Sequence, residues 1–253
     1  MKKPTIKAWF KIAVVAALTL TGAISSQSQI LWDNPVTISG TPDIDLNGTI
    51  VKAYNIGERY DVTFPDIYFA DFQTNTVDNY LSITSPASIG QASSFDNGSW
   101  KGAPPYQAPF DTLDSSDYGF LFRGGIYAQA NQPLTVTLSN LTPGVEYQVQ
   151  VWINDSRNYG NTRNAILSSA GGMDSAPVNY NQGSTNTLGN YIIGTFVANS
   201  TGIEIFNISS SAGGQINALV LSVIPEPSAW LLSVSGLVIL AGCSLFKHKK
   251  ISA

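Results

Sequence analysis

The chain has 253 residues, with 13 lysines and arginines, 17 aspartates and glutamates, and a formal net charge of −4. Its one cysteine, Cys243, and its one histidine, His248, both lie near the C-terminus, so the rest of the chain holds no disulfide, no histidine-based catalytic triad and no metal site of histidines and cysteines. Without the lysine-bearing ends, six basic residues face sixteen acidic ones, which argues against nucleic acid as a partner.

The first 28 residues have the pattern of a secretory signal peptide. Four lysines accompany a short apolar run over 12–20, and small residues follow at positions 23, 25, 26 and 28. The apolar run is too short for a comfortable membrane span. We therefore predict that 1–28 form a signal helix that is removed during export, with cleavage after Ser28.

The last 30 residues, 224–253, contain three parts in order. Pro225, Glu226 and Pro227 end the preceding strand, because proline lacks an amide hydrogen and disfavours helix in the residue before it. An uncharged apolar run over 229–246 follows, and lysines come after it. We predict a transmembrane helix over 229–246 with its lysine end in the cytoplasm; a buried core helix is the alternative.

This order of parts resembles the PEP-CTERM sorting domain of Gram-negative bacteria. The resemblance implies a partner, an exosortase-type membrane protease that processes the chain near Pro225, Glu226 and Pro227. It also implies transient anchoring in the inner membrane, followed by transfer to the cell surface or the extracellular matrix. The tail carries lysines and a histidine where the family usually carries arginines.

Between the two ends, short strand-like segments alternate with turns rich in Gly, Asn, Ser and Pro. The clearest strand is 134–138, where apolar residues alternate with threonines, and a Pro-Gly turn separates it from 145–154. No helix of useful length is expected between Leu31 and Ile224. We predict an all-β fold, a single jelly-roll or β-sandwich domain over 29–223 flanked by the signal helix and the transmembrane helix. Its other strands are expected at 49–55, 62–72, 119–128, 191–198, 202–208 and 216–223.

Two segments resemble galactose-binding-like jelly rolls. They are 141–152, Leu-Thr-Pro-Gly-Val-Glu-Tyr-Gln-Val-Gln-Val-Trp, and the closing strand 215–221. Such domains occur in bacterial surface proteins and carbohydrate-binding modules, although the first pattern is also found in fibronectin-type sandwiches. The resemblance implies the fold and makes a polysaccharide an expected partner.

The strand 145–154 is a candidate glycan-binding element. If its polar face is solvated, an aromatic ring stacks on a sugar while neighbouring amides bond to the hydroxyls, and Arg157 in the following loop adds a group that binds anions. The alternative is that a loop covers this face and the tryptophan belongs to the core. The residues on this face are Gln148, Gln150, Trp152 and Asn154.

The segment 43–48 matches the first half of a calcium loop, with short oxygen-bearing side chains alternating before a glycine. Tyr54 stands where an EF-hand needs a bidentate glutamate, which excludes an EF-hand. A structural calcium ion held by Asp43, Asp45 and Asn47 with ligands from elsewhere is one interpretation. Asx turns at the start of a strand are the other.

The composition permits one class of enzyme. Aspartate and glutamate are the remaining general acids and bases, so catalysis would be that of a carboxylate-pair glycosidase using Glu58, Glu146 or Glu204, which no spacing pairs. We therefore predict a non-catalytic carbohydrate-binding protein that is exported to the cell surface or matrix. A purely structural matrix or biofilm protein and, after it, a glycosidase are the alternatives.

Overall fold

A computed structural model describes residues 29–92, 109–157, 160–183 and 187–225. The expected signal helix, the expected transmembrane helix, and Glu226 and Pro227 of the sorting motif lie outside these ranges. Within the described ranges, no helix is long and apolar enough to cross a membrane.

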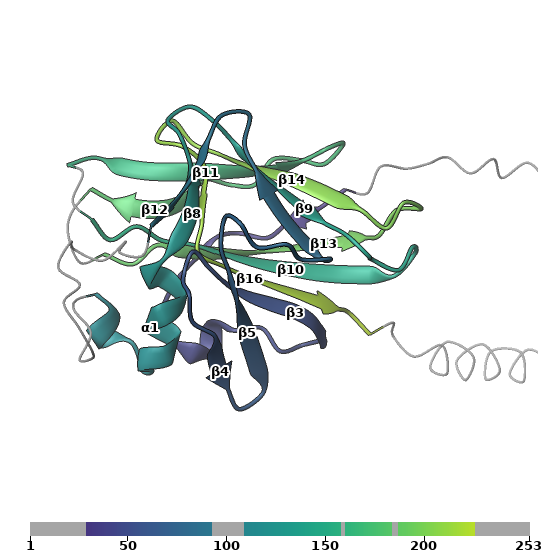
Figure 1. Cartoon of the computed structure of the whole chain (residues 1–253), viewed down its shortest axis with the longest axis horizontal. Helices are drawn as coiled ribbons and strands as arrows, with labels where there is room; N and C mark the ends of the chain where they lie inside the picture. Colours follow the sequence, from purple (N-terminus) through teal and green to yellow (C-terminus); the bar gives the residue numbers. More distant parts are fainter. Residues whose placement is uncertain (1–28, 93–108, 158–159, 184–186, 226–253) are drawn as a thin grey trace, which may run out of the picture.

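Two sheets pack face to face, together with a short third sheet, so the predicted all-β sandwich is confirmed (Figure 1). The smaller main sheet has the order β12 (Val178–Gln182), β11 (Thr162–Ser169), β14 (Glu204–Ser209), β9 (Leu134–Leu138) and β6 (Leu81–Thr84). The short sheet is β15 (Gln215–Ile216), β8 (Gly125–Ala128) and β7 (Ile89–Ala92). The larger sheet has eight strands: β1 (Leu31–Trp32), β13 (Asn190–Val197), β10 (Glu146–Ile153), β16 (Ala218–Val223), β3 (Thr49–Ile56), β5 (Ile67–Phe72) and β4 (Val62–Phe64), in that order, and β2 (Val36–Thr37), which pairs with β13.

The main core lies between the two large sheets. The alternation along β10 places Tyr147, Val149 and Val151 in this core with exposed fractions of 4% or less, as the sequence predicts. Val136 of β9 and Phe206 of β14 meet them from the smaller sheet. Each such side chain contributes about 1.5–3 kcal/mol when it is fully buried, so this apolar layer holds the sheets together.

A second core covers the opposite face of the larger sheet. It is built by the helix α1 (Ser116–Arg123), by the short 3-10 helices η2 (Thr41–Asp43) and η3 (Phe110–Thr112), and by the β4–β5 hairpin. Figure 1 shows α1 beside the β3, β4 and β5 end of the molecule. The core residues of this layer include Phe69, Phe110, Tyr118, Leu121, Phe122, Trp152 and Val220.

The strand expected over 119–128 is wrong in its first half, where the chain forms α1 before entering β8. The Ser115 hydroxyl caps the helix by accepting a hydrogen bond from the Tyr118 amide (3.4 Å), and acidic Asp117 and basic Arg123 lie at the ends that suit their charges. The strand expected over 62–72 is divided into β4 and β5 by a turn at Pro65. Strands β6, β7, β11 and β12 were not anticipated from the sequence.

Candidate functional site

The face of β10 expected to bind a glycan is covered. Trp152 is 0% exposed, and its indole Nε1 donates a hydrogen bond to the hydroxyl of Tyr118 in α1 (3.1 Å). The ring of Phe69 packs edge-on against it, with 6.3 Å between ring centres. The prediction of a solvated face at Trp152 is therefore wrong, and the alternative, a core tryptophan beneath a covering segment, is what the structure shows.

The side-chain amides of this face form hydrogen bonds within the protein. Gln150 is buried, accepts a hydrogen bond from the Asp45 amide (3.0 Å) and donates one to the Asp43 carbonyl (2.6 Å). Asn154 is buried, and its side-chain oxygen accepts from the Gly189 amide (2.7 Å). These hydrogen bonds engage the side-chain amide groups of Gln150 and Asn154 to which sugar hydroxyls would have to bind.

Two further residues of the predicted site lie apart from the covered tryptophan. Gln148 is half-buried on β10. Arg157 is also half-buried, and its guanidinium donates two hydrogen bonds of 2.8 Å to the Asp155 carboxylate. An anion would have to compete with a carboxylate that is already bound, so Arg157 supports the loop after β10.

The predicted calcium segment forms hydrogen bonds in place of a metal site. The Asp43 carboxylate accepts from the amide and hydroxyl of Ser39 (2.6 Å each), the Gly40 amide (3.1 Å) and the Tyr118 hydroxyl (2.8 Å). These donors occupy the oxygen lone pairs that a cation would use. Asp45 accepts from the Asn47 amide (2.8 Å), which is the Asx turn of the alternative interpretation.

Tyr118 connects this segment to the covered face. Burial raises the pKa of its phenol, and the charge of Asp43 and the hydrogen bond to it raise the pKa further. Tyr118 therefore stays protonated and donates to Asp43 while accepting from Trp152. Across the described ranges, no three histidine, cysteine, aspartate or glutamate side chains gather closely enough to hold a metal.

An open polar pocket lies elsewhere, where β3 and β5 end. These two strands are parallel, with Ile56 opposite Phe72, so the segments that leave their carboxyl ends lie side by side. Gly57 makes the turn possible: its φ is +85°, and an added Cβ would lie 2.3 Å from the Gly125 nitrogen. The pocket has a volume of about 680 Å³ and is lined by Gly57, Glu58, Arg59, Tyr60, Gln73, Thr74, Asn75, Gln91 and Arg123.

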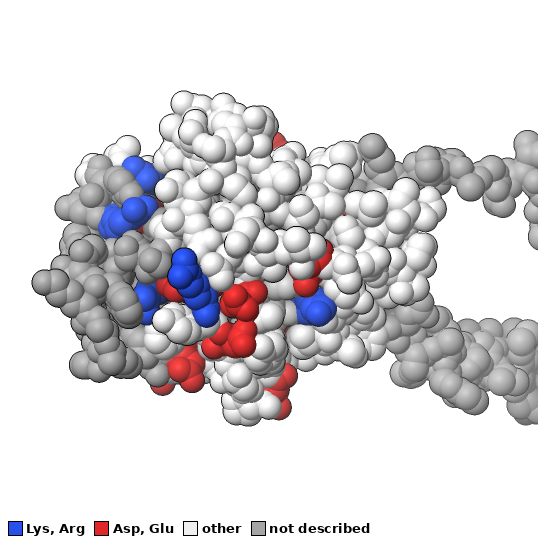
Figure 2. All heavy atoms as spheres, in the orientation of Figure 1, with Lys and Arg blue, Asp and Glu red and all other residues white. Residues whose placement is uncertain are grey.

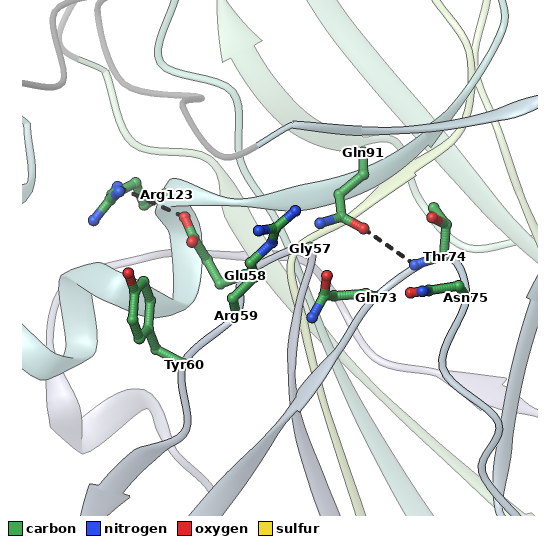
Figure 3. Close-up of a pocket in the computed structure, with 9 residues that line it drawn as sticks. All are labelled: Gly57, Glu58, Arg59, Tyr60, Gln73, Thr74, Asn75, Gln91 and Arg123. Atoms are coloured by element: carbon green, nitrogen blue, oxygen red, sulfur yellow. Dashed lines mark hydrogen bonds and ion pairs between the residues drawn. The ribbon is translucent and has the colours of Figure 1, made fainter.

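The pocket has two chemically different sides (Figure 3). Glu58, Arg123 and the ring of Tyr60 lie on one side, and the amides and hydroxyl of 73–75 and Gln91 lie on the other. Gln91 accepts a hydrogen bond from the Thr74 amide (3.1 Å), which joins β7 to the segment after β5. The Arg59 side chain extends between the two sides (Figure 3).

The charged side contains a buried ion pair. Arg123 Nε lies 3.6 Å from Glu58 Oε1, and both side chains are at most 6% exposed. Gly124 allows this approach, because an added Cβ would lie 2.6 Å from the Glu58 Cγ. On the face that Figure 2 shows, charged side chains gather near β3, β5 and α1, while the surface over the smaller sheet is largely uncharged.

Buried amides hold the segment that carries Arg123. Asn217 donates to the Gly124 carbonyl (2.7 Å) and the Asn154 carbonyl (3.1 Å), and accepts from the Asn154 amide (2.7 Å). Asn55 holds the other wall by donating to the Tyr60 carbonyl (2.8 Å). Asn154, predicted to touch a ligand, is thus part of the support behind the pocket.

Glu58 of the pocket and Glu146 do not form a glycosidase pair. Glu58 lies two residues beyond Ile56, the last residue of β3. Glu146 is the first residue of β10, and Trp152 near the far end of β10 lies opposite Ala218, which in turn pairs with Asn55 of β3. At about 3.3 Å per residue, these two glutamates are separated by roughly 20 Å along the sheet. Glycosidase carboxyl groups lie about 5–9.5 Å apart.

No sequence pattern predicted this pocket. Its residues come from four separate segments, and among them only Glu58 is a candidate catalytic residue from the sequence. The one local signal was Gly57 followed by Glu58, Arg59 and Tyr60, a turn with several functional groups directly after a strand.

No family model matches the chain. It is 28% identical over 132 residues to endo-1,4-beta-xylanase A of Thermoanaerobacterium saccharolyticum, covering 50% of this chain and 11% of that protein. The chain thus spans about a tenth of the length of this curated relative.

The solved structures that it resembles are distant. The ANX2 ectodomain from Arabidopsis thaliana has a TM-score of 0.42 and 10% identity, covering 70% of this chain and 50% of that one. A CBM35 from Cellvibrio japonicus Abf62 has a TM-score of 0.28 and 14% identity, covering 56% and 91%. Likenesses at this level assign neither a ligand nor a reaction to this chain.

Proposed function

We propose that this domain is a non-catalytic carbohydrate-binding module that holds sugar units of a polysaccharide in the pocket beyond β3 and β5. The observation that carries the proposal is the pocket lining, which has an exposed tyrosine ring on one side and three amide side chains and a threonine on the other. Amides and hydroxyls both donate and accept hydrogen bonds, as sugar hydroxyls do. The Tyr60 ring, in a side chain that is 59% exposed, offers an apolar face for a pyranose.

The pocket is also of suitable size. Ligand sites commonly measure about 300–1,000 Å³, and this one measures about 680 Å³. The stretch of partial identity to an endo-1,4-beta-xylanase supports a polysaccharide as the ligand class, since that protein acts on a polysaccharide. Binding without hydrolysis is favoured because Glu58 is paired with Arg123 and is remote from Glu146.

Export and surface location are part of the proposal. The signal-peptide pattern over 1–28 and the Pro225-Glu226-Pro227 motif with its apolar run support secretion and processing by an exosortase-type protease. The geometry suits this role. β16 leads toward the sorting motif and ends at Val223 opposite Thr49, the first residue of β3, whereas the pocket lies beyond Ile56, its last residue. Along β3, the pocket is therefore about 23 Å from Val223, where the chain leaves the sheet toward the sorting motif.

A panel of soluble polysaccharides, xylan among them, tests the proposal on the full-length chain. We expect saturable binding that Tyr60→Ala weakens at least about tenfold, the effect of losing one good aromatic contact. Tyr68→Ala is the matched control, because Tyr68 is similarly exposed (54%) but lies outside the pocket. Absence of binding to every member of the panel would reject the proposal and favour a purely structural matrix protein. Release of reducing sugar would favour a glycosidase.

A further inference from the structure

The pocket concentrates positive charge in an acidic domain. Two of the six basic residues outside the lysine-bearing ends, Arg59 and Arg123, line it, together with one acidic residue, Glu58. The Glu58 carboxylate is already paired with Arg123 at 3.6 Å. The lining therefore retains the charge of one guanidinium.

Arg59 differs from Arg123 and Arg157 in its surroundings. Arg123 is paired with Glu58, and Arg157 with Asp155. In the part of the chain that the structure describes, the exposed guanidinium of Arg59 has no carboxylate within ion-pair distance. It extends into the pocket between Glu58 and Gln91 (Figure 3). A guanidinium without a protein partner binds carboxylates readily, because its planar fork matches their two oxygens.

We propose that the pocket selects sugars that carry a carboxylate, that is, uronic acid units, with the Arg59 guanidinium as the counter-ion. This inference rests on the proposed function and names its ligand class. The carboxylate of the sugar pairs with Arg59, and its ring hydroxyls bond to Gln73, Asn75 and Gln91 on the amide side. Arg123 is a positioning residue, since its partner Glu58 neutralises it and fixes the wall beside Tyr60.

A neighbouring carboxylate limits how strongly the pocket prefers a sugar that carries a carboxylate. The Asp71 carboxylate accepts a hydrogen bond from the side-chain Nε2 of Gln73 (3.3 Å), so one carboxylate lies just behind the amide side. It opposes an anionic ligand, and solvent screens the exposed guanidinium as well. We therefore expect a preference of about tenfold rather than a larger one.

Calorimetric titration of the full-length chain with D-glucuronate and D-glucose tests this selection. We expect glucuronate to bind about tenfold more tightly, and the difference to vanish in Arg59→Gln while glucose binding is retained. Arg59→Lys should restore part of the preference, because it keeps the charge but loses the fork. Arg163→Gln, on β11 outside the pocket, is the control and should keep the full preference.

Two further probes separate carboxylate recognition from general charge attraction. The methyl ester of glucuronate should bind like glucose, and inorganic sulfate should not displace glucuronate at equal concentration. Equal affinity for glucuronate and glucose, or an unchanged preference in Arg59→Gln, would overturn the inference and leave the proposed function intact. Sulfate that competes fully would overturn the uronic acid assignment, and failure of both sugars and all polysaccharides to bind would reject both proposals.

Discussion

The covered face around Trp152 and the open pocket beyond β3 contain the same kinds of residue. Both combine an aromatic ring with amides and an arginine nearby. On the covered face, Trp152, Gln150 and Asn154 are buried, and each has hydrogen-bond partners within the protein. In the pocket, Arg59 and Tyr60 are exposed. Residue type therefore does not distinguish a core from a site here; what distinguishes them is whether the aromatic ring and the polar side chains beside it are buried or exposed to solvent.

The largest expected effect concerns the covered face. Trp152→Ala removes a fully buried ring that packs against Phe69 and donates to Tyr118. It should lower the free energy of unfolding by about 3–5 kcal/mol, as measured by urea denaturation. Trp152→Phe keeps most of the volume and should cost less. A loss below about 1 kcal/mol in Trp152→Ala would show that this face is not part of the core.

The next effect separates supporting amides from ligand-binding amides. Asn217→Ala leaves the Gly124 carbonyl and the Asn154 amide without this partner, and should cost about 1–3 kcal/mol in unfolding free energy. Asn75→Ala, at an exposed amide of the pocket, should change stability by less than about 0.5 kcal/mol while weakening glycan binding. Equal stability losses in the two variants would contradict this division.

The smallest effect is the pH dependence of the loop that follows β5. Partial burial raises the pKa of Asp78, but hydrogen bonds from the Tyr54 hydroxyl and from the Tyr80 and Leu81 amides outweigh it, so the pKa lies below its ordinary 3.8. Because the pKa of Asp78 is lower in the folded state than in the unfolded state, its ionised carboxylate stabilises the fold at pH values above the unfolded-state pKa. This contribution disappears as the pH falls through the folded-state pKa.

Urea denaturation across an acid pH series measures this contribution. Both proteins should lose unfolding free energy as the pH falls, and wild type should lose more than Asp78→Asn. Because Asp78 is largely solvated, this difference should be less than about 1 kcal/mol. Tyr54→Phe removes one of the hydrogen bonds and should shift the loss toward higher pH. Identical acid profiles for wild type and Asp78→Asn would remove Asp78 from the account.

Local patterns predicted the strands whose environments are regular. The apolar alternation of 134–138 and 145–154 identified β9 and β10 and the inward residues of β10, because one face of each strand meets the main core. The helix α1 was missed because it is only eight residues long and reads as apolar and aromatic. Ser115 as a helix cap and the spacing of Tyr118, Leu121 and Phe122 were the signals for it.

The site depended on long-range contacts. Alternation showed that Gln150 and Trp152 share a face. The cover over Trp152 comes from α1, some 30 residues earlier in the chain, and the partners of Gln150 come from Asp43 and Asp45, more than 100 residues earlier. The pocket depends on the parallel pairing of β3 and β5 and on Arg123 being brought to Glu58. The spacing of residues within a strand does not predict which distant strand it pairs with when no local turn joins the two strands.

The most direct test compares glycan affinity in three forms of the full-length chain: wild type, Tyr60→Ala and Trp152→Phe. We predict that Trp152→Phe binds like wild type once its folding is verified, because Trp152 lies beneath α1, and that Tyr60→Ala binds at least about tenfold more weakly. Loss of binding in folded Trp152→Phe, with Tyr60→Ala unaffected, would contradict the account and return the site to the covered face of β10.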